Sequence, residues 1–320
     1  MAETLAPVGP ARLIINGEAA DAASGKTFIT VNPATEEPIC AVAEAGAEDV
    51  DRAVRAARVA FDAGPWPKMR PAERQRILWR LGDLILEHAD ELGRLETLDN
   101  GKPIFESRQI DAPMVAGCFH YFSGWATKLT GETVPVNPAW FTFTLREPLG
   151  VVGAIIPWNF PMIMVGWKCA PALAAGNTVV LKPAMETPLT AVRIGELALD
   201  AGLPPGVLNI VPGRGSVAGE ALVKHPQVDK ISFTGSTEVG QRIMREAAET
   251  VKKLTLELGG KSPNIVFADA DQEAALRGAS TGIFYGKGEV CAAGSRLLVE
   301  KSIHAEFVAK LVERAKKLVP

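Results

Sequence analysis

The stretch beginning at residue 151 reads Val-Val-Gly-Ala-Ile-Ile. It opens a region, ending near Leu256, in which short β-rich runs alternate with segments of helical length. Strands and helices that alternate in this way form βαβ units, whose strands lie parallel in one sheet between layers of helices. The region therefore predicts an α/β fold with a doubly wound parallel sheet. The predicted strands are Val151 to Ile156, Thr178 to Leu181, Val207 to Val211, Lys230 to Phe233 and Lys253 to Leu256.

A polar residue or a glycine follows each of these strands. In chain order these residues are Asn159, Lys182, Gly213, Gly235 and Glu257. Ligands bind at the carboxyl ends of the strands in open parallel sheets, so the five positions predict a ligand site at one sheet edge. Each position also has a plainer interpretation: a turn or N-cap asparagine, a surface lysine, two ordinary strand-to-helix glycine turns and a solvated acid at a strand end.

A cysteine lies in a further glycine-rich turn. Cys291 is followed by Ala292, Ala293 and Gly294, which leave room for a substrate to approach. A thiol reacts as its thiolate, which a helix N-terminus, a cation or a neighbouring base favours. Together with Glu257, which leads into its own glycine-rich turn, Cys291 predicts covalent catalysis with a general base. The alternative is a buried packing cysteine, since free cysteines are among the most buried residues.

Five segments closely resemble the motifs of the NAD(P)-dependent aldehyde dehydrogenase superfamily, in the family's order and at its spacing. They are Pro157 to Pro161, Leu181 to Ala184, Phe233 to Gly240, Leu256 to Lys261 and Gly288 to Cys291, and the resemblance extends over residues 12–320. It implies a dinucleotide-binding domain (residues 12–130 and 149–258), a protruding oligomerisation β-hairpin (131–148) and the N-terminal part of an α/β catalytic domain (259–320).

The resemblance implies oxidation of an aldehyde to a carboxylic acid. Cys291 would attack the aldehyde, and Asn159 would donate to the oxyanion together with the backbone N–H of Cys291. Glu257 would activate the water that hydrolyses the thioester. The helix after Asn159 is expected to shape an apolar substrate entrance through Phe160, Met164 and Trp167, unless these are ordinary packing residues.

The resemblance also implies a site for NAD or NADP. Lys182 is expected at the adenosine ribose, Ser236 near the phosphates and Val239 against the adenine. Met185 stands where many NAD-preferring members carry a ribose-binding glutamate, so the choice of cofactor stays open. The implied cofactor residues are Ile155, Pro157, Trp158, Lys182, Gly213, Phe233, Gly235, Ser236, Thr237, Glu238, Val239, Gly240 and Leu258.

The flanking segments predict supporting elements, and residues 12–129 are not expected to carry chemistry. Residues 12–15 and 27–31 predict strands of a peripheral sheet, and residues 140–145 predict a hairpin strand. Helical spacing predicts helices over residues 47–61, from Pro71, over 89–99 and over 106–129, the last kinked or split at Pro113. Beyond Glu257 we expect strands at 264–267 and 296–299 and helices at 271–283 and 302–318.

Composition narrows the function classes. The 320 residues are 47% hydrophobic and carry a net charge of −3, with no basic block suited to nucleic acid. Four cysteines without tight pairing favour a reducing, cytoplasmic compartment, with Cys118 and Cys169 as packing residues. Four scattered histidines predict no metal site. The N-terminal residues lack the features of a signal peptide, and no apolar run reaches about 18 residues, so no membrane span is expected.

The family's catalytic domain continues beyond residue 320, so the sequence resembles a C-terminally shortened member. The complete form is expected to be a homodimer or homotetramer. Missing strands would leave open sheet edges, so we expect the isolated chain to bind dinucleotide weakly and to turn over aldehyde poorly or not at all. Two other functions remain open: a nucleotide-binding protein without turnover, and a cysteine-dependent esterase or acyl transferase that needs no cofactor.

Overall fold

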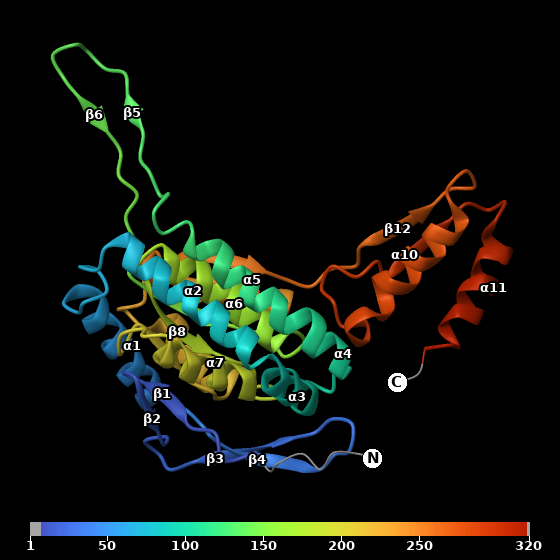
Figure 1. Cartoon of the computed structure of the whole chain (residues 1–320), viewed down its shortest axis with the longest axis horizontal. Coiled ribbons are helices and arrows are strands. Elements are labelled where there is room, and N and C mark those ends of the chain that lie inside the picture. Colours follow the sequence, from blue (N-terminus) through green and yellow to red (C-terminus); the bar gives the residue numbers. More distant parts are fainter. Residues whose placement is uncertain (1–7, 319–320) are drawn as a thin grey trace. The chain divides into compact units, whose positions relative to one another are not determined.

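Residues 8–318 are described by the computed structural model, and they divide into two units (Figure 1). The first unit holds the described residues up to Thr234 together with Glu238–Leu256. The second holds Gly235–Thr237 and the described residues from Glu257 onward. Each unit has its own set of buried apolar side chains.

The first unit is built on a seven-stranded sheet with the strand order β11-β10-β7-β8-β9-β1-β2. Neighbours among β10, β7, β8 and β9 are parallel, whereas β1 runs antiparallel to both β9 and β2, so the sheet is mixed. The α/β fold predicted from the sequence is confirmed. The strands are β11 (Lys253–Glu257), β10 (Lys230–Thr234), β7 (Val151–Ile155), β8 (Thr178–Lys182), β9 (Leu208–Ile210), β1 (Leu13–Ile15) and β2 (Glu18–Ala20).

The strand near residue 12 differs from the prediction of a peripheral sheet, because it joins the main sheet as β1. All three residues of β1 are buried, as expected for a strand covered on both faces. Asn16 and Gly17 have positive φ and connect β1 to β2 in a tight hairpin. The peripheral pair is instead β3 (Thr27–Val31) with β4 (Pro38–Ala43).

Helices pack on this sheet and form a further layer. The sheet is contacted by α6 at β7 and β8, by α7 at β9 and β1, and by α1 at β7, β8 and β9. In addition, α2 and α5 pack over α6, and α8 packs against α1. The bounds are α1 Ala47–Asp62, α2 Pro71–Glu87, α3 Ala89–Asn100, α4 Ile104–Glu106, α5 Ala112–Ser123, α6 Pro161–Ala174, α7 Leu189–Asp200, α8 Glu220–Lys224 and α9 Thr237–Ala247. Short π-helical turns cover Ser107–Asp111 and Gly215–Gly219, and a 3₁₀ turn covers Ala248–Thr250.

The helix predicted over residues 106–129 is divided and ends early. A π-helical turn separates α4 from α5, and Pro113 lies in the first turn of α5. Proline has no N–H to donate, and it lies where the π-helical turn passes into α5. The helical segment ends at Ser123, six residues before the predicted end.

The hairpin over residues 131–148 projects from the first unit (Figure 1). Its paired strands are β5 (Thr133–Val134) and β6 (Thr142–Phe143), which is much shorter than the run predicted over residues 140–145. Trp140 is 75% exposed and Phe141 is 78% exposed. The aromatic run is apolar, but within this chain it lies outside any core.

In the second unit, two parallel strands are packed against two helices. The strands β12 (Pro263–Val266) and β13 (Arg296–Val299) pair, and α10 (Gln272–Phe284) contacts α11 (His304–Ala315). A 3₁₀ turn at Tyr285–Gly288 follows α10. Val266, Leu276, Ala279 and Phe307 form the buried core. These elements confirm the predicted strands and helices beyond Glu257, apart from shorter ends of the last helix.

Candidate active site

Three of the predicted cofactor residues lie side by side at the carboxyl edge of the sheet. Ile155 at the end of β7 pairs in register with Lys182 on β8 and with Phe233 on β10. Lys182 is only 5% exposed, and burial lowers the pKa of its ammonium to about 8 against the opposing charge of Glu186. The surface-lysine interpretation is therefore wrong. A buried ammonium at this edge suits a polar or anionic ligand.

The turns after β9 and β10 differ in character. A Cβ atom on Gly213 would lie 2.6 Å from the carbonyl oxygen of Ala45. The close approach of these two backbone segments is therefore enough to explain the glycine. In the turn that opens α9, Ser236, Thr237, Glu238 and Val239 are all exposed, while Gly240 is buried. The first-turn N–H groups of a helix provide a natural anion site. The first turn of α9 is exposed, and phosphate binding there stays a prediction.

Asn159 lies in the turn between β7 and α6 and is half-buried, with an exposed Trp158 before it. The side chain of Asn100 donates to the carbonyl oxygen of Trp158 at 2.7 Å. On the other side, the ammonium of Lys102 lies 3.8 Å from the centre of the Phe160 ring. The residues that flank Asn159 are thus both held by the segment that ends α3. Pro157, the first residue of the turn, is half-buried.

The expected substrate entrance is only partly open. Phe160 and Met164 are buried, as in ordinary helix packing, whereas Trp167 is 51% exposed. Within the first unit, Trp167 is therefore the one of the three residues that reaches the surface.

In the second unit, the turns that carry the predicted base and nucleophile touch each other. Glu257 is exposed at the end of β11, and Leu258 after it is half-buried. A Cβ atom on Gly260 would lie only 3.1 Å from the carbonyl oxygen of Cys291. Arg296 donates from its side chain to the carbonyl oxygen of Lys261 at 2.8 Å, which ties β13 to the glutamate turn. Asn159 belongs to the first unit, and Glu257 and Cys291 to the second.

The four cysteines, all within residues 8–318, differ in exposure. Cys291 is exposed, Cys40 and Cys169 are buried, and Cys118 is half-buried. Burial raises the pKa of Cys118 to about 11 and that of Cys169 to about 12, so both thiols are protonated at neutral pH. The packing interpretation of Cys118 and Cys169 is confirmed, and the same interpretation of Cys291 is wrong.

A buried charged cluster in the helical layer was not predicted. Glu96 accepts from the N–H of Met162 at 3.3 Å, at the start of α6, and from the hydroxyl of Thr190. Asp99 accepts from the N–H of Leu189 at 2.9 Å, at the start of α7. Two carboxylates of α3 thus cap two other helices. The run Asp99-Asn100-Gly101-Lys102 was the available signal, but it resembles an ordinary helix end.

The carboxylates of this cluster predict a pH-dependent stability. Burial raises the pKa of both Glu96 and Asp99 to about 7. Their folded pKa values exceed the unfolded values of about 4, so the stability they contribute is present below about pH 4 and is lost as pH rises through about 7. Asp99→Asn should remove part of this slope in urea unfolding experiments between those limits. Asp200→Asn, an exposed change on α7, is the control, and equal slopes for the two variants would contradict the assignment.

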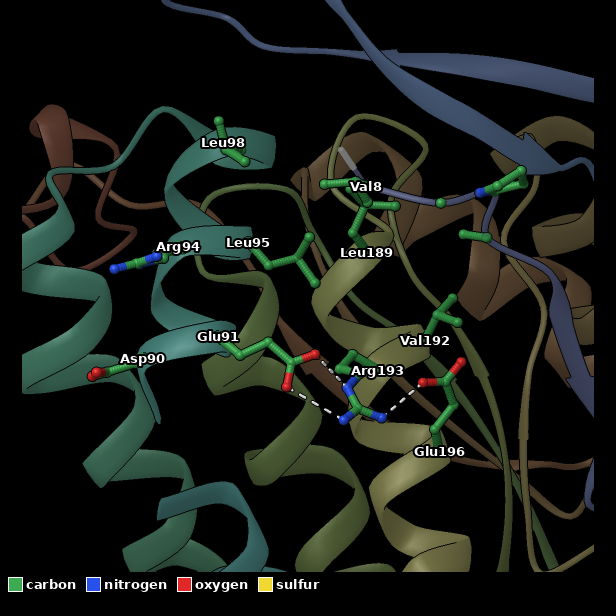
Figure 2. A pocket seen from close by; sticks show the side chains of 13 residues that line it. Val8, Asp90, Glu91, Arg94, Leu95, Leu98, Leu189, Val192, Arg193 and Glu196 are labelled. Atoms are coloured by element: carbon green, nitrogen blue, oxygen red, sulfur yellow. Dashed lines mark hydrogen bonds and ion pairs between the residues drawn. The ribbon is translucent and has the colours of Figure 1, made fainter. Parts of the chain in front are cut away.

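A separate groove lies between α3 and α7, with Val8–Ala11 along one side (Figure 2). Its volume is about 730 Å³, and its apolar lining comes from Leu95, Leu98, Leu189 and Val192. Arg193 on α7 donates across it to Glu91 of α3 at 2.7 Å, and along α7 to Glu196 at 2.9 Å. None of the motif residues lines this groove.

Residues 8–318 contain neither a metal-binding cluster nor a membrane-spanning helix. No cluster of three or more histidine, cysteine, aspartate or glutamate side chains is arranged to hold a metal ion. No helix in this part of the chain combines the length and the apolar character needed to cross a bilayer.

Comparison with known proteins gives the family. The model of the family described as "Aldehyde dehydrogenase family" matches residues 20–320. "Aldehyde dehydrogenase family 2 member B4, mitochondrial" of Arabidopsis thaliana is 54% identical over 313 residues, covering 98% of this chain and 58% of the relative. "Benzaldehyde dehydrogenase, mitochondrial" of Antirrhinum majus is 52% identical over 307 residues, covering 96% and 58%.

Solved structures agree with the sequence relatives. The structure titled "NAD+ complex structure of aldehyde dehydrogenase from bacillus cereus" superposes with a TM-score of 0.96 at 49% identity, covering 97% of this chain and 63% of that one. The chain thus spans about three fifths of the length of these relatives. Since the family model matches nearly the whole chain, this protein belongs to the aldehyde dehydrogenase family.

Proposed function

We propose that this chain carries the nucleotide site and the reacting groups of an enzyme that oxidises an aldehyde to a carboxylic acid with NAD(P)+. The observation that supports this most strongly is the exposed Cys291 in a turn that touches the Glu257 turn. A nucleophile and a base on adjoining glycine-rich turns suit a covalent mechanism with a hydrolytic second half.

In the proposed mechanism, Cys291 supplies the nucleophile. Its thiolate attacks the carbonyl carbon, and the amide of Asn159 donates to the oxygen that becomes negative. Loss of the former aldehyde hydrogen as hydride would convert the thiohemiacetal into a thioester, and NAD(P)+ bound at the nucleotide site would supply the hydride acceptor. Glu257 then removes a proton from a water molecule that attacks the thioester, which releases the acid and restores the thiol.

The residues at the carboxyl edge fit a dinucleotide. The buried ammonium of Lys182 can donate to ribose hydroxyls, and the exposed first turn of α9 can receive the pyrophosphate. Ile155 lies in register between Lys182 and Phe233, and we expect Ile155 and Phe233 to provide an apolar floor. The Bacillus cereus relative is described by its title as an NAD+ complex, which supports the same cofactor class here.

Position 185 is proposed to weaken the discrimination against NADP+. A carboxylate near the ribose repels a 2′-phosphate, and Met185 carries no charge. Met185→Glu should therefore raise the preference for NAD+ over NADP+, measured as the ratio of dissociation constants by fluorescence titration. Met185→Leu, an apolar change of similar volume, should leave the ratio unchanged. Preference of the unaltered chain for NAD+ by about a thousandfold, or about 4 kcal/mol, would refute the role of this position.

Glu257→Gln should separate hydrolysis from hydride transfer. The amide keeps the size of the side chain but cannot take a proton from water, so the acyl-enzyme should accumulate after a burst of reduced cofactor. Mass spectrometry of the intact protein during turnover tests this, with Glu273→Gln on α10 as the exposed-carboxylate control. A variant that shows no acyl adduct while hydride transfer is slow would count against Glu257 as the base.

Two alternatives follow from the length of the chain relative to its relatives. A fragment with three fifths of their length could bind nucleotide without turnover, and Cys291 alone could support ester hydrolysis or acyl transfer. Reduced nicotinamide absorbance with a panel of apolar aldehydes, run beside ester hydrolysis without cofactor, separates these functions. Aldehyde-dependent reduction supports the dehydrogenase, ester hydrolysis alone supports the esterase, and cofactor binding alone supports the impaired fragment. Benzaldehyde belongs in the panel because of the Antirrhinum majus relative's name.

Assembly and location are further proposals. The exposed Trp140, Phe141 and Leu145 of the hairpin support a role in joining copies of the complete enzyme. Four cysteines that form no disulfide support a reducing compartment such as the cytoplasm.

A further inference from the structure

We propose that Asn100 and Lys102 are positioning residues that fix the side-chain amide of Asn159. The proposal rests on the proposed function for the meaning of that amide, but the placement of the amide can be measured without any catalysis. All the groups involved lie in the first unit.

Asn100 holds the residue before Asn159. Its side chain is buried and donates to the carbonyl oxygen of Trp158 at 2.7 Å. That carbonyl belongs to the peptide plane that carries the N–H of Asn159. The hydrogen bond therefore limits rotation of the backbone immediately before the amide-bearing residue.

Lys102 holds the residue after Asn159. Its side chain is 0% exposed, and its ammonium contacts both the carboxylate of Asp111, at 2.5 Å, and the face of the Phe160 ring, at 3.8 Å from the centroid. Asp111 is likewise 0% exposed. A desolvated ammonium over the face of an aromatic ring makes a favourable cation–π contact. Phe160 is also buried, so its ring cannot turn away without losing this contact.

Gly101 lets Asn100 contact Trp158 and Lys102 contact Phe160, on either side of Asn159. It ends α3 in the left-handed conformation, with φ of 76°, and turns the chain between Asn100 and Lys102. A Cβ atom there would lie 2.7 Å from Pro33, so the turn has no room for a side chain. As a result, the segment Asn100–Lys102 holds both neighbours of Asn159.

The contacts to Trp158 and Phe160 matter because an oxyanion donor must be fixed in place before the negative charge develops. A displacement of about 1 Å at a reacting group can cost a hundredfold in rate. Asn159 is only half-buried, so its own packing limits its motion less than the packing of a core residue would. The contacts of Asn100 and Lys102 with its two neighbours limit the motion of its backbone further.

The test observes the Asn159 amide directly by NMR. The chain has eight asparagines, so selective ¹⁵N labelling gives eight side-chain amide pairs, and Asn159→Asp identifies the pair of Asn159. Asn100→Ala should shift or broaden the two amide resonances of Asn159. The resonances of Asn177, which accepts from the N–H groups of Leu149 and Gly150 in the same unit, should not change. Asn209→Ala removes a comparable buried amide from β9 and is the matched control.

A second variant tests the same proposal in case Asn100→Ala does not fold. Lys102→Met with Asp111→Asn removes the buried ammonium together with the carboxylate that pairs with it. It should also move the Asn159 pair and spare that of Asn177. An Asn159 pair unchanged in both variants, or moved equally by Asn209→Ala, would overturn the positioning role.

Kinetics separates this proposal from the proposed function. In a form that turns over, Asn100→Ala should lower kcat by up to about a hundredfold with KM unchanged, and should cost nothing further when combined with Asn159→Ala. An additional loss in the double variant would overturn the positioning role. Absence of aldehyde oxidation would count against the proposed function only, because the NMR result decides the placement of the amide.

Discussion

Cys291→Ala is expected to abolish aldehyde-dependent reduction of the cofactor and to remove every covalent adduct formed with an aldehyde substrate. The hydride leaves only from the tetrahedral adduct, and alanine has no atom with which to form it. The loss should therefore reach the limit of detection instead of a partial decrease. Intact-protein mass spectrometry measures the adduct even when overall turnover is slow, and the absorbance of reduced nicotinamide measures the oxidation.

The other cysteines provide controls for Cys291. Cys118→Ser and Cys40→Ala should leave the adduct and the oxidation intact, because burial raises the pKa of both thiols and keeps them protonated at neutral pH. Both variants should bind nucleotide as the unaltered chain does. Full dehydrogenase activity in Cys291→Ala would show that the covalent mechanism is wrong.

The sequence predicted the central strands well for a physical reason. Strands buried on both faces appear as continuous β-rich runs, and every residue of Val151–Ile155 and Thr178–Lys182 is buried. The prediction failed for β1, whose three residues are too few to distinguish a strand of the main sheet from one of a small separate sheet. It also overestimated β6, because the aromatic run at residues 140–145 has strand propensity but no second layer to cover it.

The positions of candidate site residues were predictable where these residues directly follow a strand. Lys182 and the turn of Ser236 follow predicted strands, so their place at the carboxyl edge needed only the βαβ rule. The α3 cluster could not be predicted in the same way. Glu96 and Asp99 lie on a helix whose charged residues would ordinarily face water, but α6, α7 and Thr30 of β3 pack against them and bury them. Burial of this kind depends on tertiary contacts that a local pattern does not contain.

Asn159→Ala should lower kcat by about 10² to 10³, the usual cost of removing one oxyanion donor. The amide is expected to bind the oxygen strongly only after charge develops there, so kcat and kcat/KM should fall together while KM stays near its original value. Presteady-state formation of reduced nicotinamide in a form that turns over measures the step itself. Asn137→Ala, on the projecting hairpin, is the control and should change none of these values.

The size of the loss also tests how the amide is held. If Asn100 and Lys102 act through Asn159, their single variants should lose less than Asn159→Ala, since a misplaced donor still reaches the oxygen part of the time. The other proposed oxyanion donor is the backbone N–H of Cys291, a residue that none of these substitutions alters. A large rise in KM with unchanged kcat in Asn159→Ala would assign the amide to ground-state binding of the substrate, and would remove it from the oxyanion site.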